Sequence, residues 1–134
     1  MASKNIFKQM DAKNGQSAGP PRNPNSIKDA LIRWCQIKTR EYHNVNITNF
    51  SSSWCDGMAF CALIHHFRPE AFDFQKLEPR RRKENFELAF RVAKDAGIEP
   101  FLEVEDMILM GDKPDWKCVF TYVQQFYTRF KNED

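Results

Sequence analysis

The most concentrated charge in this 134-residue sequence is a run of four consecutive basic residues, Arg80, Arg81, Arg82 and Lys83. Side chains of these types bind carboxylates and phosphates, arginine through paired hydrogen bonds and lysine as a point charge. As a solvated helix start, the run would pair with Glu84 and Glu87 one turn on. Four positive charges in a first turn oppose the helix dipole, however, and that favours contact with an acidic protein surface or an anionic lipid headgroup. Both interpretations stay open on the sequence.

A second group of basic side chains falls where the first predicted helix ends, at Lys38, Arg40 and His43. Lys38 and Arg40 lie off the apolar stripe of that helix, so packing in a core does not account for them. We expect both basic groups to lie at the surface, and we treat them as candidate contacts for a partner.

Residues that could act as nucleophile, acid or base are present, but not in a catalytic arrangement. The serines at 51–53 suit a loop and a helix cap, and no histidine lies beside them in sequence. His65 and His66 close a predicted helix, where they interact favourably with its dipole, and capping accounts for Asp56. The folded part has no glycine-rich phosphate loop and no G-x-S-x-G turn. We therefore expect a protein that is not an enzyme and uses no cofactor.

The four cysteines fall in apolar stretches and form no C-x-x-C pair: Cys35, Cys55, Cys61 and Cys118. Such a pattern predicts free, buried thiols in a reducing compartment. Cys61 and His65 are four residues apart on a predicted helix and share a face, which raises the alternative of a zinc site. A structural zinc site takes four ligands, and these are two. The sequence therefore predicts no metal site.

Charge is divided unevenly between the start of the chain and the rest. Residues 1–24 carry four basic residues and one acid, a net +3. Residues 25–134 carry sixteen basic and seventeen acidic residues, a net −1. A domain with this balance is not a general polyanion binder, so nucleic acid is not an expected partner. No apolar run approaches the roughly 18 residues of a membrane span, and the first residues lack a signal-peptide pattern. We expect a soluble protein of the cytoplasm.

Residues 1–24 have few apolar side chains and are interrupted by glycine and proline, which predicts a flexible tail. Within it, Ile6, Phe7 and Met10 share one helical face. That face indicates either a short partner-binding segment or part of a frayed tail.

Apolar spacing predicts helices over residues 25–42, 53–67, 79–96, 104–110 and 114–131. Ser53 and Asp56 fit a capping box at the start of the second helix, which is apolar all round and therefore central. Pro79 suits the first turn of the third. The expected fold is all-α, an irregular bundle of four main helices and one or two short ones. Its predicted core signature is Trp34, Trp54, Gly57, Phe60, Leu63, Phe86, Phe90, Trp116 and Phe120. Gly57 indicates a close approach of two backbones.

Five segments carry a recognisable pattern: LIRWC at 31–35, NFSSSWCDGMAFCALIH at 49–65, RKENFELAF at 82–90, EVEDM at 103–107 and KPDWKCVFTYV at 113–123. In this order they resemble the calponin homology domain over about residues 26–131. Residues 50–59 and 69–73 are most similar to the smoothelin and smoothelin-like group, with cytospin-type domains next. The implied organisation is a tail at 1–24, one calponin homology domain at 25–131 and a short end at 132–134.

The resemblance implies a non-enzymatic module of actin-cytoskeleton proteins, including muscle proteins, with the actin filament and tropomyosin as partners. Strong filament binding in that family usually takes two such domains in tandem, so one domain implies weak or indirect binding and an adaptor or regulatory role. Calmodulin is also implied, but the basic segment that would bind it is not among residues 1–134. The apolar face of the last helix, including Trp116, could also suit calmodulin, although the core needs the same stripe. The rival hypothesis is a phosphoinositide-binding module that uses the same basic residues.

Overall fold

The computed structural model describes residues 24–133, and within them it contains helices and no strand. Its α-helices are α2 (Pro24–Lys38), α3 (Met58–Phe67), α4 (Arg82–Asp95), α5 (Val104–Met110) and α6 (Trp116–Phe130). Two 3₁₀ turns, η1 (Ser52–Trp54) and η2 (Phe74–Lys76), lie in the connections. Four long helices and one short one confirm the all-α prediction. The predicted flexible tail lies outside the described residues, except for Pro24.

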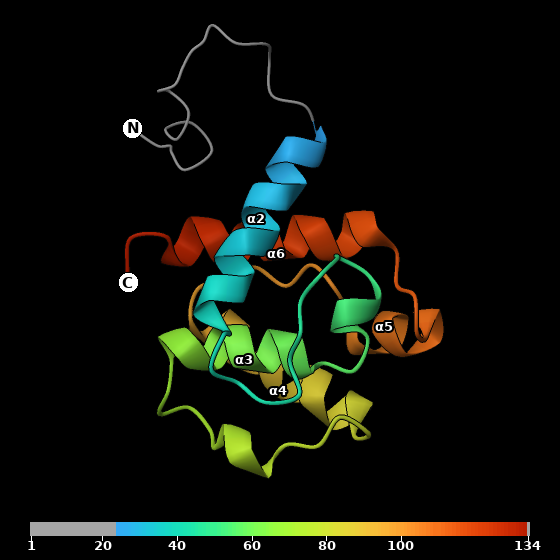
Figure 1. The fold of residues 1–134 in the computed structure, drawn as a ribbon. Coiled ribbons are helices and arrows are strands. Elements are labelled where there is room, and N and C mark those ends of the chain that lie inside the picture. Colours follow the sequence, from blue (N-terminus) through green and yellow to red (C-terminus); the bar gives the residue numbers. More distant parts are fainter. Residues whose placement is uncertain (1–23, 134) are drawn as a thin grey trace, which may run out of the picture.

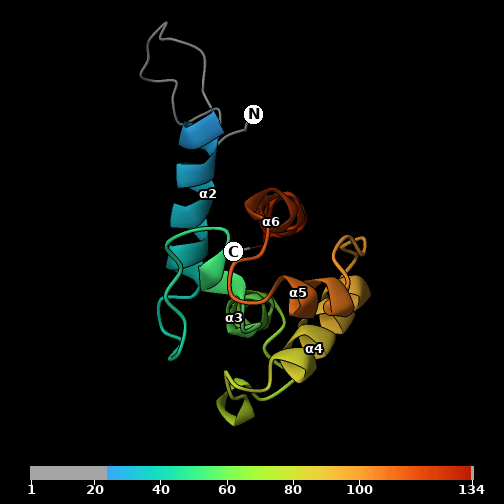
Figure 2. The ribbon, with the colours of Figure 1, turned by 90° about the vertical axis from the view of Figure 1, so that its right-hand side faces the viewer.

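Helix α3 is the centre of the domain. Eight of its ten residues are buried, because the sequence from Met58 to Ile64 is apolar on every side. Figures 1 and 2 show α6 running along nearly the same direction as α3, with α2 crossing both and α4 on another side of α3. The ring of Phe60 lies 4.7–6.3 Å from five other aromatic rings, those of Trp54, Phe86, Phe90, Tyr122 and Phe126.

The hydrogen bonds at the start of α3 differ from the predicted capping box. Ser53 Oγ accepts hydrogen bonds from the backbone N–H groups of Thr48 and Asn49, at 3.0 and 3.3 Å, and so closes the preceding loop. Asp56 Oδ1 accepts from the Met58 N–H at 2.9 Å. Gly57 has φ +83°, a left-handed backbone conformation that separates η1 from α3. The helix therefore begins at Met58 and not at Ser53.

Other helix ends also differ from the prediction. Pro79 lies ahead of α4, because the Arg81 N–H closes a turn onto the Glu78 carbonyl at 3.0 Å. Helix α2 ends at Lys38, four residues early. The Thr39 hydroxyl donates to the Cys35 carbonyl at 2.8 Å, and the chain turns away over the next residues.

Most of the predicted core signature is buried, with one correction. Phe90 and Phe120 are half-buried, whereas Trp116 is 37% exposed. Trp116 is the first residue of α6, and the Lys28 ammonium lies 3.7 Å from the centre of its ring. All four cysteines are free, but Cys55 and Cys118 are only half-buried.

The desolvated carboxylate of Asp56 leads to a prediction about pH. Partial burial raises the pKa of Asp56 above its ordinary 3.8, despite the Met58 N–H bond and the Arg82 charge. The folded state then holds this proton more tightly than the unfolded state, so stability falls as pH rises from 3.8 through the raised pKa. Asn at position 56 keeps an acceptor for the Met58 N–H and removes the charge. We expect Asp56→Asn to flatten this part of the stability–pH curve, measured by urea unfolding.

The matched control is Asp73→Asn. Asp73 Oδ1 also accepts from a backbone N–H, that of Gln75 at 3.0 Å, but Asp73 is exposed. This variant should leave the slope in place. An unchanged slope in Asp56→Asn would contradict the assignment to Asp56.

Candidate partner-binding surface

The first predicted basic group lies where α2 ends, and we call Lys38, Arg40 and His43 the α2 corner. Lys38 and Arg40, but not His43, line a hollow of about 250 Å³, together with Ile37, Glu41, Tyr42 and His66. Arg40 is exposed and forms no ion pair within residues 24–133. The apolar side chain of Ile37 is 50% exposed beside it. Charge and exposed apolar surface are therefore combined at one place.

Aromatic packing holds the α2 corner against the end of α3. The Tyr42 hydroxyl and His65 Nδ1 are 2.9 Å apart, and the Tyr42 ring lies 4.8 Å from that of Phe74. The His43 ring lies 5.4 Å from the same phenylalanine. Burial, with the nearby Glu41 charge, raises the pKa of Tyr42, so its hydroxyl remains protonated at neutral pH. A basic surface backed by these contacts is preorganised, which reduces the entropy lost on binding.

The second basic group, which we call the arginine run, is Arg80, Arg81, Arg82 and Lys83. Arg80 and Arg81 precede α4, whereas Arg82 and Lys83 belong to its first turn. The carboxylate of Glu78 lies 2.7 Å from Arg80 Nη2 and 3.6 Å from Arg81 Nε. Arg82 Nη2 lies 2.8 Å from Asp112 Oδ1, an ion pair that raises the pKa of Arg82. Three of its four cations are therefore already next to carboxylates.

These ion pairs correct the expected pairing of the arginine run with Glu84 and Glu87. The observed partners lie before the run and some thirty residues after it, not one turn along α4. Glu78 and Asp112 therefore offset part of the charge that opposes the α4 dipole.

The two basic groups do not form one surface. The arginine run lies near the start of α3, where the Asn85 side chain donates to the Asp56 carbonyl at 2.9 Å. The α2 corner lies at the opposite end, where Tyr42 meets His65. Ten helical residues, roughly 15 Å, separate these ends. A partner that contacts both groups would have to span α3.

The possible nucleophiles serve structural roles. The Ser51 hydroxyl donates to the Pro114 carbonyl at 2.6 Å, which ties the loop before α3 to the start of α6. Burial raises the pKa of the Cys61 thiol to about 12, and that of Cys35 further, so both remain protonated at neutral pH.

Among residues 24–133, no three acidic, histidine or cysteine side chains are grouped to hold a metal ion. None of the described helices combines the length and hydrophobicity needed to cross a bilayer.

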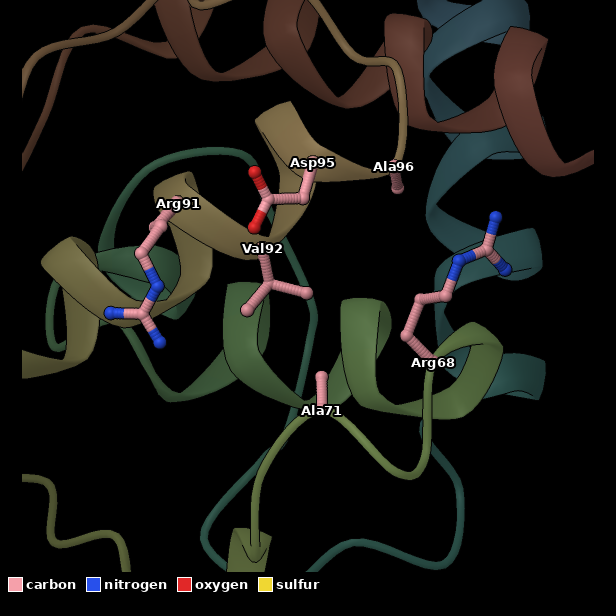
Figure 3. A pocket seen from close by; sticks show the side chains of 6 residues that line it. All are labelled: Arg68, Ala71, Arg91, Val92, Asp95 and Ala96. Carbon is pink, nitrogen blue, oxygen red and sulfur yellow. The ribbon is translucent and has the colours of Figure 1, made fainter.

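A second hollow, of about 300 Å³, lies between α4 and the segment after α3 (Figure 3). Figure 3 shows Arg91 and Asp95 on α4, with the Arg68 guanidinium pointing away from them. Arg68 instead pairs with Glu133, with nitrogen–oxygen distances of 2.8 and 3.3 Å. Its hydrogen bond lowers the pKa of Glu133. The arrangement ties the residues after α6 to the end of α3.

Sequence reasoning missed two parts of the surface. One is Ile37, which is half-exposed. It lies off the apolar stripe formed by Ile27, Leu31 and Trp34, and this position on the helix is the signal that indicates exposure. The apolar residues Ile108 and Leu109 on α5 are exposed as well. A short apolar helix gives no periodic signal that separates a buried face from an exposed one.

Comparison with known proteins agrees with this fold. A family model described as the calponin homology (CH) domain matches residues 25–132. The chain is 48% identical to smoothelin-like protein 1 of Mus musculus over 129 residues, covering 88% of this chain and 28% of that protein. For the Homo sapiens protein of the same name the identity is 51% over 102 residues, covering 75% and 20%. Cytospin-A of Xenopus tropicalis is 45% identical over 106 residues, covering 79% and 10%. The chain thus spans less than a third of each of these relatives, and it belongs to the calponin homology domain family.

Proposed function

We propose that this domain is a non-catalytic interaction module of a cytoskeleton-associated protein, and that it binds actin filaments weakly or through tropomyosin. Membership of the calponin homology family supports the class of function. The α2 corner is the main contact in this proposal. The observation that supports this choice is the exposed cation Arg40, without an ion pair in residues 24–133, beside the exposed side chain of Ile37.

The arginine run is the weaker contact in this proposal. Arg80 and Arg81 share the Glu78 carboxylate, and Arg82 has Asp112. An acidic partner would have to compete with these carboxylates, so the net gain per arginine is small. Lys83 is exposed and has no ion pair in the described part of the chain, and it remains a candidate contact.

Co-sedimentation with actin filaments, with and without tropomyosin, tests the proposal. In the structure Arg40 and His43 are exposed, whereas Lys38 is half-buried. The triple variant Lys38→Ser, Arg40→Ser and His43→Ser should bind about tenfold more weakly, because three contacts of roughly 0.5 kcal/mol each are lost. Ile108→Ser on α5 is a control that removes exposed apolar surface elsewhere and should pellet like the unchanged protein.

The rival function, binding to anionic lipids through the same basic residues, is separated by vesicle flotation. Lipid binding by charge alone weakens as ionic strength rises, because salt screens exposed charges over about 10 Å. A domain that floats with phosphoinositide-containing vesicles at low salt, and never pellets with filaments, would contradict the proposal. Pelleting without vesicle binding would support it.

A further inference from the structure

Helix α5 carries the most exposed large apolar side chain in the described part of the chain. Leu109 is 85% exposed, Ile108 beside it 43%, and Phe101 in the preceding loop 46%. We call these three residues the α5 face. Met107 of the same helix is buried, and Val104 and Met110 also pack against the core. A leucine exposed to this extent contributes little to folding, and clustered exposed apolar residues mark interaction sites.

The α5 face lies in the most acidic part of the domain. Residues 99–115 contain six acids and one lysine, a net −5, whereas residues 25–134 together carry −1. The acids are Glu99, Glu103, Glu105, Asp106, Asp112 and Asp115. Asp112 pairs with Arg82 and Asp115 caps α6. The other four are exposed and form no ion pair within residues 24–133. An occupant of the α5 face should therefore combine apolar side chains with positive charge.

The chain itself contains a segment of this composition outside the described residues. Between positions 4 and 13 it carries three lysines, Lys4, Lys8 and Lys13, against one aspartate. Ile6, Phe7 and Met10 have the spacing i, i+1, i+4, which places them on one side of a helix. We call this stretch segment 4–13. Its apolar side and its charge both complement the α5 face.

Side-chain contacts place the start of α2 near α5. Lys28, one turn into α2, has its ammonium 3.7 Å from the ring centre of Trp116. The neighbouring Asp115 N–H lies 3.3 Å from the sulfur of Met110, the last residue of α5. Figure 1 shows α5 beside the turn that leads into α6. The ten residues 14–23 can span roughly 35 Å, so segment 4–13 can reach the α5 face.

We propose that segment 4–13 docks on the α5 face of its own chain. Its apolar side packs on the α5 face, and its lysines approach the surrounding carboxylates. A short linker gives an effective concentration of about a millimolar, so a contact with a millimolar dissociation constant is about half occupied. The segment would then compete with any outside partner for the α5 face.

Hydrogen exchange of the α5 amides in the full chain tests the docking. Half occupancy slows exchange about twofold, so the triple variant Ile6→Ser, Phe7→Ser and Met10→Ser should exchange about twofold faster in α5. These substitutions lie outside residues 24–133 and change no side chain of the described core. The control Ile37→Ser changes a half-exposed apolar residue at the other end of α2 and should leave α5 unchanged. Equal α5 exchange in the tail variant and the unchanged chain would overturn the proposal.

A charge exchange gives an independent test at low salt. Lys4→Glu with Lys8→Glu should speed α5 exchange, and so should Glu105→Lys with Asp106→Lys. The combination of all four should restore slow exchange. Because Glu105 and Asp106 lie in the first turn of α5, their reversal also weakens that helix, so restoration by the tail charges is the decisive result. Failure to restore overturns the proposal. Loss of protection on dilution also overturns it, since that result would assign the contact to two copies of the chain.

Discussion

Asn85→Asp is expected to lower the free energy of unfolding by about 4 kcal/mol, because it places an unpaired charge among acceptors. Asn85 is 1% exposed, and its Nδ2 donates to the carbonyls of Asp56 and Glu78, both at 2.9 Å. One bond joins α4 to the turn before α3, and the other joins α4 to the loop that precedes α4. A carboxylate supplies no donor and faces both carbonyl oxygens. Urea unfolding at neutral pH measures the loss.

Two further measurements separate lost bonds from added charge. Asn85→Ala removes the same bonds without a charge and should cost less, about 2–3 kcal/mol. The new carboxylate of Asn85→Asp should have a raised pKa in the folded state. The loss of unfolding free energy should therefore shrink as the pH falls toward the pKa of an ordinary aspartate. A loss below about 1 kcal/mol in Asn85→Asp, or no dependence on pH, would contradict this role of Asn85.

Gly57→Ala is expected to destabilise the domain by about 3 kcal/mol, from overpacking together with backbone strain. A Cβ at this position would lie 2.6 Å from Asn85 Cβ and 3.3 Å from the backbone of α4, and the φ of +83° is itself unfavourable for alanine. The backbones of α3 and α4 cross here, so neither side can move away freely. Thermal or urea unfolding measures the loss.

Gly111→Ala is a control for a glycine with positive φ and no crowded Cβ. Gly111 also has positive φ, +68°, but a Cβ there would meet nothing within 4 Å. The control should lose only backbone strain, about 1–3 kcal/mol, because its φ of +68° and ψ of −134° suit glycine and lie outside the αL region of Gly57. A loss of about 1 kcal/mol or less in Gly57→Ala, the strain of its αL backbone alone, would show that the contact between Gly57 and Asn85 does not limit the packing of α3 on α4.

The sequence predicted most of what depends on local patterns. The apolar stripe of α6 and the all-apolar α3 identified the buried helices, because burial repeats with the helical period. The same rule failed at Trp116, which is the first residue of α6 and is 37% exposed. Ser53 and Asp56 have the spacing of a capping box, but loop N–H groups compete for the same serine hydroxyl.

Long-range contacts account for what the sequence did not predict about the candidate site. Positions 80–83 identified the arginine run as basic, but its pairing with Asp112 depends on how α4 and the turn after α5 meet. Spacing along one helix does not show that contact. Likewise, the hollow at the α2 corner joins Ile37 to His66 of α3, which are far apart in sequence.

The proposal that the α2 corner is the main partner contact is tested most directly by comparing two sets of serine substitutions in actin co-sedimentation with tropomyosin. One set changes Lys38, Arg40 and His43, and the other changes Arg80, Arg81, Arg82 and Lys83. We predict about tenfold weaker binding for the first set and less than about threefold for the second, because carboxylates of the same chain already pair with the arginines of the run. Full binding by the first set with loss in the second would contradict the proposal.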